Sequence, residues 1–352
     1  MTITIVASFI GFGILVFFHE MGHFLAAKKV GIRVEKFSLG MGPEIAGFTR
    51  GETRYLVSAI PFGGYCKLSG EKCSDRKGEK WEFQSHSIGE RMFVIFMGPL
   101  FNFLLAFVLF AIVFSAGVLT PDTGSTVIGR VTEGYPAEAA GLLVGDKILT
   151  INAEKVENWM GVQENIKKGI KQPIEIKVQR GSGEMEFSVT SNLDKNINRK
   201  VVGISPEEVM TQFSIIESIK EGFLHTCFLT YGIVKGLILM VLGKVKADVG
   251  GPIFIMQMMG AQAQEGVKSF LYFVGFLSVN LLIINMLPIP IVDGGLIALL
   301  GIEGIRGKPL PEKSQQIMDT IAFFAIVFLM VFITLRDILR LDQVSALLKN
   351  IK

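Results

Sequence analysis

The chain has 352 residues, of which 50% are hydrophobic and only 19% are charged, and its mean hydropathy is +0.48. Soluble domains carry about 25% charged residues, so this composition argues against a water-soluble globule and against intrinsic disorder. Lys and Arg number 35 against 32 Asp and Glu, and a net charge of +3 gives no support for nucleic-acid binding. Three cysteines in so long a chain exclude a disulfide framework.

Four segments are apolar enough to predict helices that cross a membrane, each of which needs about 20 mostly apolar residues. They begin near Thr2, Met92, Ser269 and Thr320. A fifth apolar stretch, 213–242, is interrupted by charged side chains. We expect it to lie on the membrane surface as an amphipathic helix, which needs an apolar face rather than apolar length. A fifth membrane span is the alternative.

Basic residues indicate which way the chain crosses the membrane. Four of them directly follow the first span: Lys28, Lys29, Arg33 and Lys36. Because Lys and Arg collect on the cytoplasmic side, we expect the loop 28–90 in the cytoplasm and the N-terminus outside. The region after the second span then lies outside, and the third span ends in the cytoplasm.

Residues 120–205 have the composition of a small water-soluble α+β domain. Charged residues return there, and 174–178 alternates between apolar and polar residues as a strand does. The run Pro136–Leu142, followed by Gly145–Asn152, resembles the signature of a PDZ domain. PDZ domains bind an extended peptide by adding it to a sheet edge. This domain is therefore expected either to bind peptide or to act as a steric filter.

The cytoplasmic loop 28–90 is expected to hold a small membrane-associated β element. Arg54–Ile60 alternates and contains β-branched residues, which predicts a strand, and Pro61–Tyr65 predicts a turn after it. The strand would present an open edge beside the membrane, and such an edge either templates a partner or must be blocked. A plain hairpin that covers the loop is the alternative.

Residues suited to catalysis are concentrated in the run His19-Glu20-Met21-Gly22-His23, at the cytoplasmic end of the first span. Residues i and i+4 share one face of a helix, so both imidazoles can reach one metal ion, and Glu20 can act beside it as a general base. This is the spacing of zinc proteases. Ionisable groups inside a spanning segment are costly and usually functional.

A catalytic zinc site takes three protein ligands and leaves one position open. Asp293 is the best third ligand, because it lies in the run Asn285–Gly295, where two prolines and two glycines break the third span. Broken helix at membrane depth is tolerated where it lines a cavity. The predicted topology places Asp293 and the histidine pair on the same side of the membrane. His86 and His225 lack a motif and are expected to be structural or surface residues.

Together these features resemble the site-2 protease family, and in particular the bacterial RseP/RasP-type zinc intramembrane proteases. The resemblance covers nearly the whole chain, and it rests on His-Glu-x-x-His, Gly63-Gly64-Tyr65, Gly98-Pro99…Asn102, the single PDZ domain, Gly250-Gly251-Pro252, and Asn-x-x-Pro-x-Pro-x-x-Asp-Gly-Gly at 285–295. Ile291-Val292 departs from the family, which more often has Leu or Phe at the second position. The single PDZ domain puts in doubt a filtering role that needs a tandem pair.

The resemblance implies a polytopic α-helical membrane protein with about four transmembrane helices, an inserted α+β PDZ domain and the small β element. It implies zinc (Zn2+) held by His19, His23 and Asp293 in a metalloendopeptidase that performs regulated intramembrane proteolysis. Its substrates would be pre-trimmed single-span membrane proteins, such as anti-sigma factors or remnant signal peptides, met within membrane lipid. The protein would lie in the bacterial cytoplasmic (inner) membrane with its PDZ domain on the extracytoplasmic side.

The predicted regions follow one another along the chain: helix 1 with the His-Glu-x-x-His run (1–27), the cytoplasmic loop (28–90), helix 2 (91–119), the PDZ domain (120–205), the membrane-surface region (206–268), helix 3 with the Asp293 motif (269–302), and helix 4 with the C-terminal tail (303–352).

Two asparagines are candidates for stabilising the oxyanion of peptide hydrolysis. Asn285, two turns before Asp293, is the first, and Asn280 is the second. An interhelical hydrogen bond is the alternative role for Asn280. A helical substrate must unwind before cleavage, and we expect the extended strand to pair with residues 54–60 and with the turn formed by Gly63, Gly64 and Tyr65.

Two other functions fit part of the pattern. A metal transporter would explain the intramembrane His and Asp residues, but not Glu20 at this spacing or the PDZ domain. A catalytically silent membrane scaffold would use the PDZ domain, but it would have no need of an intact His-Glu-x-x-His run together with Asp293.

Overall fold

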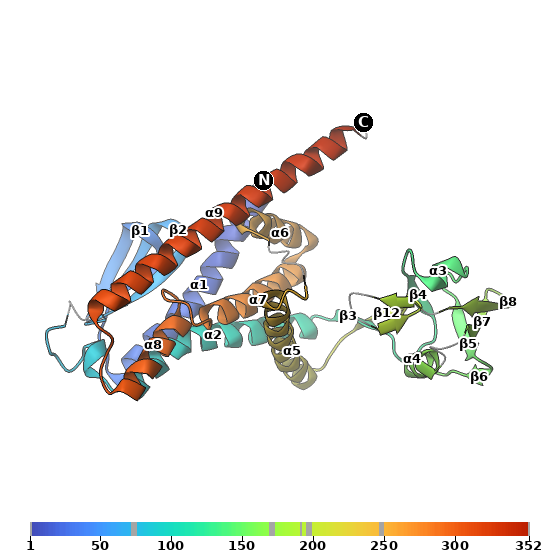
Figure 1. Cartoon of the computed structure of the whole chain (residues 1–352), viewed down its shortest axis with the longest axis horizontal. Helices are drawn as coiled ribbons and strands as arrows, with labels where there is room; N and C mark the ends of the chain where they lie inside the picture. Colours follow the sequence, from blue (N-terminus) through green and yellow to red (C-terminus); the bar gives the residue numbers. More distant parts are fainter. Residues whose placement is uncertain are drawn as a thin grey trace. The chain divides into compact units, whose positions relative to one another are not determined.

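The computed structural model describes residues 2–71, 76–168, 173–190, 192–194, 199–245 and 250–350. The chain forms two compact units, one made of 1–116 together with 214–352 and the other of 117–213 (Figure 1). The first unit contains the long helices and the second is rich in short strands.

The helices of the first unit are, in chain order, α1 (Thr2–Val30), α2 (Ile88–Ser115), α5 (Ile215–Val241), α6 (Pro252–Glu265), α7 (Val267–Asn285), α8 (Asp293–Arg306) and α9 (Glu312–Asn350). Among the described residues, five helices are long and apolar enough to cross a membrane, namely α1, α2, α5, α7 and α9. The sequence predicted about four, and the structure adds α5 to the candidates.

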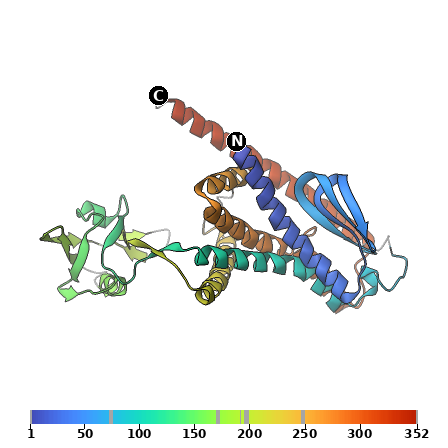
Figure 2. The same cartoon turned by 180° about the vertical axis from the view of Figure 1, so that it is seen from behind.

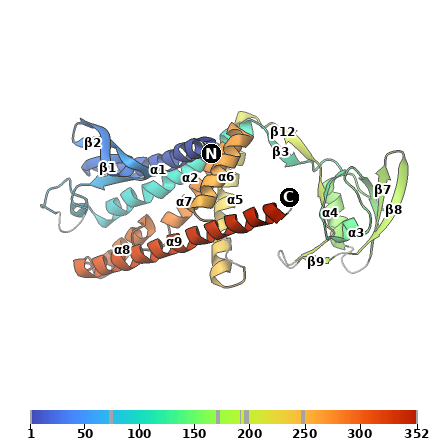
Figure 3. The same ribbon diagram turned by 90° about the horizontal axis from the view of Figure 1, so that it is seen from above.

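Helix α5 meets the requirements of a span because three of its four charged residues lie near its N-terminal end, with Lys235 the one charge further along. Glu217, Lys220 and Glu221 lie in its first two turns, where Ser214 and Glu217 form a capping box. The rest of the helix is apolar enough to qualify. Helix α5 nevertheless runs across α2 instead of alongside it, as Figure 3 shows, and its Gly222 packs against the backbone of Ala111.

Helix α2 is the centre of the first unit, because α1, α5, α7 and α8 all pack against it. It begins at a capping box formed by Ser87 and Glu90, and it contains Pro99. Its buried side chains include Val94, Leu105 and Phe110. Both helices that hold the predicted metal ligands, α1 and α8, therefore rest on the same support.

The β element is formed by two long antiparallel strands, β1 (Val34–Arg50) and β2 (Thr53–Leu68), which lie beside the C-terminal half of α1 (Figure 2). Leu39 faces both Val57 and Gly64, so the bend of β2 lies between these two residues and the first half of β1 lies between the two halves of β2. The strand predicted at 54–60 is confirmed.

The prediction that the strand 54–60 forms an open edge is wrong. Its residues pair on one side with 44–50 and on the other with the first half of β1. Gly63, Gly64 and Tyr65 lie within β2, and the segment 64–68, which pairs with the first half of β1, is the part of this element that lies beside α1. The reason is the length of the two strands, which lets each fold back upon the other.

The second unit is a small α+β domain. Its main sheet has the antiparallel order β6 (Glu154–Lys155), β5 (Lys147–Ile151), β7 (Ile174–Arg180) and β8 (Gly183–Val189). Two short helices accompany it, α3 (Pro136–Ala139) and α4 (Trp159–Lys168). Shorter strand pairs join β3 (Val118–Pro121) to β12 (Glu208–Thr211), β4 (Ile128–Val131) to β11 (Ile204–Pro206), and β9 (Asn192–Asp194) to β10 (Arg199–Val201).

In the second unit, the predicted run Gly145-Asp146 is joined to strand β7 by an ion pair with Arg180. Asp146 is 1% exposed and accepts a hydrogen bond of 2.7 Å from Nε of Arg180. Burial acts to raise the pKa of the Asp146 carboxyl, but hydrogen bonds from Arg180 and the Leu143 amide outweigh it and hold the pKa below its usual range. Leu142, four residues before Asp146, lies in the buried apolar core of this unit together with Ile176.

Candidate metal centre

Helix α1 carries two histidines on one face, as their spacing predicts. His19 and His23 lie one helical turn apart, with Nε2 of one 3.3 Å from Nε2 of the other. The Nδ1 atom of His23 lies 3.0 Å from the main-chain oxygen of Val94 in α2 and donates to it. A ring that carries its proton on Nδ1 has a free electron pair on Nε2, which is the form that binds a metal.

Asp293 reaches the histidines because the chain stops being helical before it. Helix α7 ends at Asn285 and α8 begins at Asp293. Pro288 and Pro290 lie between them and lack the N–H groups that a continuous helix would need. Ile291 has φ +85°, a region that branched side chains rarely adopt, so this segment stores backbone strain.

Two glycines allow the start of α8 to pack against this broken segment. A Cβ on Gly294 would lie 2.4 Å from the carbonyl oxygen of Leu287, and one on Gly295 would lie 2.1 Å from that of Ile289. No side chain fits at either position without moving the backbone. The Asp-Gly-Gly run is therefore required by the close approach that aims Asp293 at α1.

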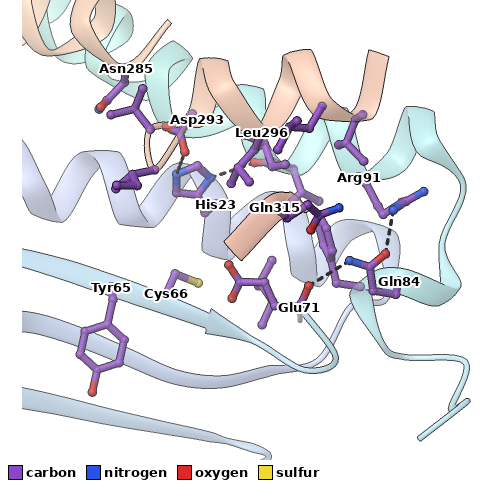
Figure 4. Close-up of a pocket in the computed structure, with 18 of the residues that line it drawn as sticks. His23, Tyr65, Cys66, Glu71, Gln84, Arg91, Asn285, Asp293, Leu296 and Gln315 are labelled. Atoms are coloured by element: carbon purple, nitrogen blue, oxygen red, sulfur yellow. Dashed lines mark hydrogen bonds and ion pairs between the residues drawn. The ribbon is translucent and has the colours of Figure 1, made fainter. Parts of the chain in front are cut away.

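The three predicted ligands meet. Asp293 Oδ2 lies 3.2 Å from His19 Nε2, and Asp293 Oδ1 lies 3.5 Å from His23 Nε2. Figure 4 shows the Asp293 carboxylate directed at the His23 ring. The ligand atoms of His19, His23 and Asp293 all lie within 4.8 Å of one another. Among the described residues, no other three His, Cys, Asp or Glu side chains lie as close together with ligand atoms that could share one ion.

The burial and the chemistry of these three side chains fit a metal ion. Asp293 Oδ2 is buried, and its 3.2 Å approach to His19 Nε2 lacks the geometry of a hydrogen bond, so within the described chain this oxygen has no hydrogen-bond donor, although a buried carboxylate oxygen normally has one or more. One carboxylate and two imidazoles are donors that zinc takes in catalytic sites, with one position left for water or substrate. The centre therefore offers three ligands of the right chemistry.

Glu20 lies between the histidine pair and the β element. Its carboxylate lies against the backbone amide of Cys66. A Cβ on Gly64 would lie 2.6 Å from a methyl of Val16 and 3.3 Å from Cγ of Glu20, so β2 touches α1 at this glycine. Only glycine permits this edge of β2 to come so near to the predicted base.

The structure brings only one of the two predicted asparagines to the centre. Asn285 has its Nδ2 3.5 Å from His19 Nε2. Asn280 donates to the carbonyl oxygen of Phe276 in its own helix at 2.8 Å, and it is not among the residues that line the cavity. Gly64 and Tyr65 line the cavity, although Figure 4 shows the Tyr65 ring pointing away from His23 and Asp293.

A cavity of about 380 Å³ opens from the centre. His19, Glu20, His23 and Asp293 line one part of it, and its other walls include the polar side chains Glu71, Gln84, Arg91, Glu303 and Gln315. Arg91 and Glu303 form an ion pair of 2.5 Å that joins α2 to α8. The cavity is thus bounded by helices that also hold the ligands in place.

The other two histidines lie outside this cavity. His86 directs its two ring nitrogens at the carbonyl oxygens of Glu82 and Val30, at 3.0 and 3.1 Å. His225 lies 3.0 Å from the hydroxyl of Tyr272 and packs against Phe110. These contacts agree with the structural roles expected for both.

Three residues of α2 touch the histidines, and their place in the sequence alone did not predict a role for them. Val94 supplies the carbonyl to His23, Gly98 would bring a Cβ to 2.2 Å from His23 Nε2, and Asn102 has its Nδ2 3.0 Å from His19 Nδ1. Gly98 and Asn102 belonged to the run on which the family resemblance rested. Their spacing of four along one helix was the available signal.

A helical protein that joins His-Glu-x-x-His to a distant Asp within apolar helices belongs to the class of membrane metallopeptidases, and comparison with known proteins agrees. Residues 7–329 match Peptidase family M50. A Bacillus subtilis protein named regulator of sigma-W protease RasP is 28% identical, with 96% of this chain and 99% of that protein covered.

Two further relatives carry the same assignment. Zinc metalloprotease RasP of Geobacillus kaustophilus is 28% identical over 95% of this chain and 97% of its own length. A Clostridium acetobutylicum protein, assigned provisionally by its name to the zinc metalloproteases, is 32% identical over 95% of this chain and 97% of its own. The chain belongs to peptidase family M50, the site-2 proteases, and is a metallopeptidase. The names of these relatives support zinc as its cofactor.

Proposed function

We propose that this protein is a zinc-dependent intramembrane endopeptidase whose metal is held by His19, His23 and Asp293. The observation that carries the proposal is the meeting of ligand atoms from α1 and α8 within 4.8 Å of one another, with Glu20 beside them. The chemistry that zinc supplies when bound is a lower pKa for its water and a polarised scissile carbonyl.

Glu20 is the proposed general base and acid. It takes a proton from the attacking water as the new C–O bond forms, and it delivers that proton to the leaving nitrogen as the C–N bond breaks. Its position beside the ligand pair supports this role, because His19 directly precedes it on α1 and His23 follows three residues later. Water enters as the second substrate, so the reaction needs no other reactant.

Asn285 is the proposed oxyanion donor. Its Nδ2 lies 3.5 Å from His19 Nε2, close to the ligands but without being one of them. An N–H group directed at the reacting carbonyl stabilises charge that develops only in the transition state. Asn280 remains a weaker candidate, because its side chain bonds to its own helix.

The substrate is proposed to be an extended segment of a membrane protein that adds to β2 at 64–68, on the edge that faces α1. This edge borders Glu20 through Gly64 and Cys66, and strand addition is a general way to hold an unfolded peptide. A Gly64→Val or Gly64→Pro variant should then cleave more slowly while retaining zinc. Tyr65→Phe, in which the ring points away from the ligands, is the matched control (Figure 4). Unchanged cleavage by the Gly64 variants would end this part of the proposal.

The sigma-W regulator RasP of Bacillus subtilis gives a reason to propose a substrate class. We infer that the natural substrates are single-span proteins of the anti-sigma factor type, or remnant signal peptides, trimmed before they reach the site. We also infer a multi-pass protein of the bacterial cytoplasmic membrane, with residues 117–213 as an extracytoplasmic PDZ domain.

We propose that α5 lies within the outer half of the membrane rather than crossing it. Helix α5 begins beside the C-terminal end of α2, where Gly222 packs on Ala111, and α6 packs through Gly260 on Thr4 at the N-terminal end of α1. By the topology inferred here, both are extracytoplasmic ends. If α5 crossed the membrane, the chain would have to return between the end of α5 at Val241 and the start of α6 at Pro252, which is too few residues for a spanning helix.

One experiment tests the central proposal. A tagged single-span substrate is coexpressed with the wild type or with Glu20→Gln, and zinc is measured on both purified proteins. A protease loses cleavage in Glu20→Gln and keeps its zinc. Wild-type cleavage by Glu20→Gln would overturn the proposal. In Glu20→Gln, a transporter would lose only ion flux, and a scaffold would be unchanged in every property measured.

A further inference from the structure

Helix α2 contacts both histidines through three residues spaced four apart. The carbonyl of Val94 accepts from His23 Nδ1 at 3.0 Å, and the Asn102 carboxamide lies 3.0 Å from His19 Nδ1. Between them, the backbone of Gly98 lies against both rings, since a Cβ there would fall within 3.0 Å of each. Residues at i, i+4 and i+8 share one face of a helix, so this face of α2 is directed at the ligands.

The Asn102 side chain is costly for the fold as it stands. It is 0% exposed, and within the described chain its Oδ1 has no hydrogen-bond partner. A buried polar atom without a partner destabilises the structure that contains it. The contact between α2 and α7 does not need this side chain, because Ser278 Oγ donates to the main-chain oxygen of Asn102 at 2.8 Å.

We propose that Asn102 is a positioning residue for the metal centre, whose carboxamide oxygen accepts the proton on His19 Nδ1. A neutral imidazole carries one proton, and His19 Nε2 is the atom that faces Asp293. A ring that binds a cation through Nε2 must hold its proton on Nδ1, and that proton needs an acceptor. A half-turn of the carboxamide about its last bond exchanges its two ends, which brings the oxygen to Nδ1 and places the amide nitrogen where the unpartnered Oδ1 lies.

The two ligands of α1 are then held by the same principle with different groups. His23 has a main-chain acceptor that no substitution removes, whereas His19 depends on one side chain. Partners of this kind fix the orientation of a ligand ring, and their loss typically lowers metal affinity about 10- to 100-fold. Because the partner of His19 is a side chain, substitution of Asn102 can test whether this face of α2 positions the ligands.

This inference rests on the proposed zinc site, and its test measures zinc affinity instead of proteolysis. The full chain in detergent is titrated against a zinc chelator of known affinity. Asn102→Leu keeps the shape of the side chain without an acceptor, Asn102→Ala removes it without crowding, and Asn102→Asp restores an acceptor that cannot donate. Ser278→Ala is the matched control, because it removes a buried contact to the same residue without touching a ring.

We expect Asn102→Leu and Asn102→Ala to bind zinc about 10- to 100-fold more weakly, and Asn102→Asp and Ser278→Ala to stay near the wild type. Thermal unfolding of the zinc-free proteins shows which variants fold. One folded variant, Asn102→Leu or Asn102→Ala, is enough to test the inference. Wild-type affinity in such a variant would overturn the inference, as would an Asp variant as weak as Leu, since that pattern indicates packing alone. If His19→Ala binds zinc as the wild type does, the proposed metal site itself fails, which is a distinct result.

Discussion

Two regions of the chain supply the ligands of this centre, and they are built in opposite ways. Helix α1 is regular through His19 and His23, so a spacing of four residues is enough to bring both rings to one point. Asp293 follows a stretch that is not helical, contains a strained Ile291, and fits only because Gly294 and Gly295 have no side chains. The first region is specified locally, and the second depends on contacts made elsewhere.

A contact near the other end of α8, in the same cavity, also holds the second region in place. Glu303 on α8 is ten residues beyond Asp293, and it pairs with Arg91 at the start of α2. Arg91 is 4% exposed, also donates to Gln84, and stacks over Phe83. Because Asp293 and Glu303 lie on the same helix, we expect this ion pair to help hold Asp293 in the direction that the packing of Gly294 and Gly295 allows.

The largest effect is expected from a change that breaks the regular region. In Gly98→Ala the new methyl would fall 2.2 Å from His23 Nε2, the atom that faces Asp293. Either the ring must turn away or α1 and α2 must separate, so we expect zinc affinity to fall about 100-fold or more. Equilibrium zinc competition measures this. Gly13→Ala in α1 is the control, since a Cβ there meets no atom within 4 Å. Equal zinc affinity in the two variants would contradict the close approach.

A smaller effect is expected where α8 is anchored. Arg91→Met leaves Glu303 partly buried without its partner, and we expect the free energy of unfolding to fall by about 2–3 kcal/mol. Zinc affinity should fall with it, because Asp293 loses its orientation. The double variant Arg91→Met/Glu303→Leu should recover most of the stability, since an apolar pair carries no unpaired charge. Denaturant unfolding in detergent measures both. If Arg91→Met is as stable as the wild type, the Arg91–Glu303 ion pair does not contribute to the free energy of unfolding.

The same contrast explains what the sequence could predict. His19, Glu20 and His23 are related by helical periodicity, and Asp293 could be placed beside them because the predicted topology put both helix ends on one side of the membrane. The break before Asp293 was likewise visible, because proline cannot continue a helix. These predictions depended on local rules and on topology, and the structure brings the three ligands together.

Contacts between distant segments could not be read in the same way. The fold-back of β1 and β2 depends on pairing across the whole element, so an interior strand at 54–60 looked like an edge. The face of α2 that carries Gly98 and Asn102 has no meaning until α1 is packed against it. The side chain of Asn280 could face a neighbouring helix or its own backbone, and spacing alone does not distinguish the two.

The smallest effect is expected from relieving strain in the broken segment. Ile291 has φ +85°, which glycine adopts without strain, whereas Ile289 does not have a positive φ. Both side chains are exposed, at 46% and 39%, so little packing is lost by removing either one. Ile291→Gly should raise the free energy of unfolding by up to about 1 kcal/mol, and Ile289→Gly should lower it by about the same amount, because glycine adds entropy to the unfolded chain. Opposite signs in denaturant unfolding would show that the native structure holds strain where Asp293 is aimed. A loss of stability in both would mean that α7 and α8 are joined by an ordinary loop, and the contrast with α1 would then rest on Gly294, Gly295 and the Arg91 anchor alone.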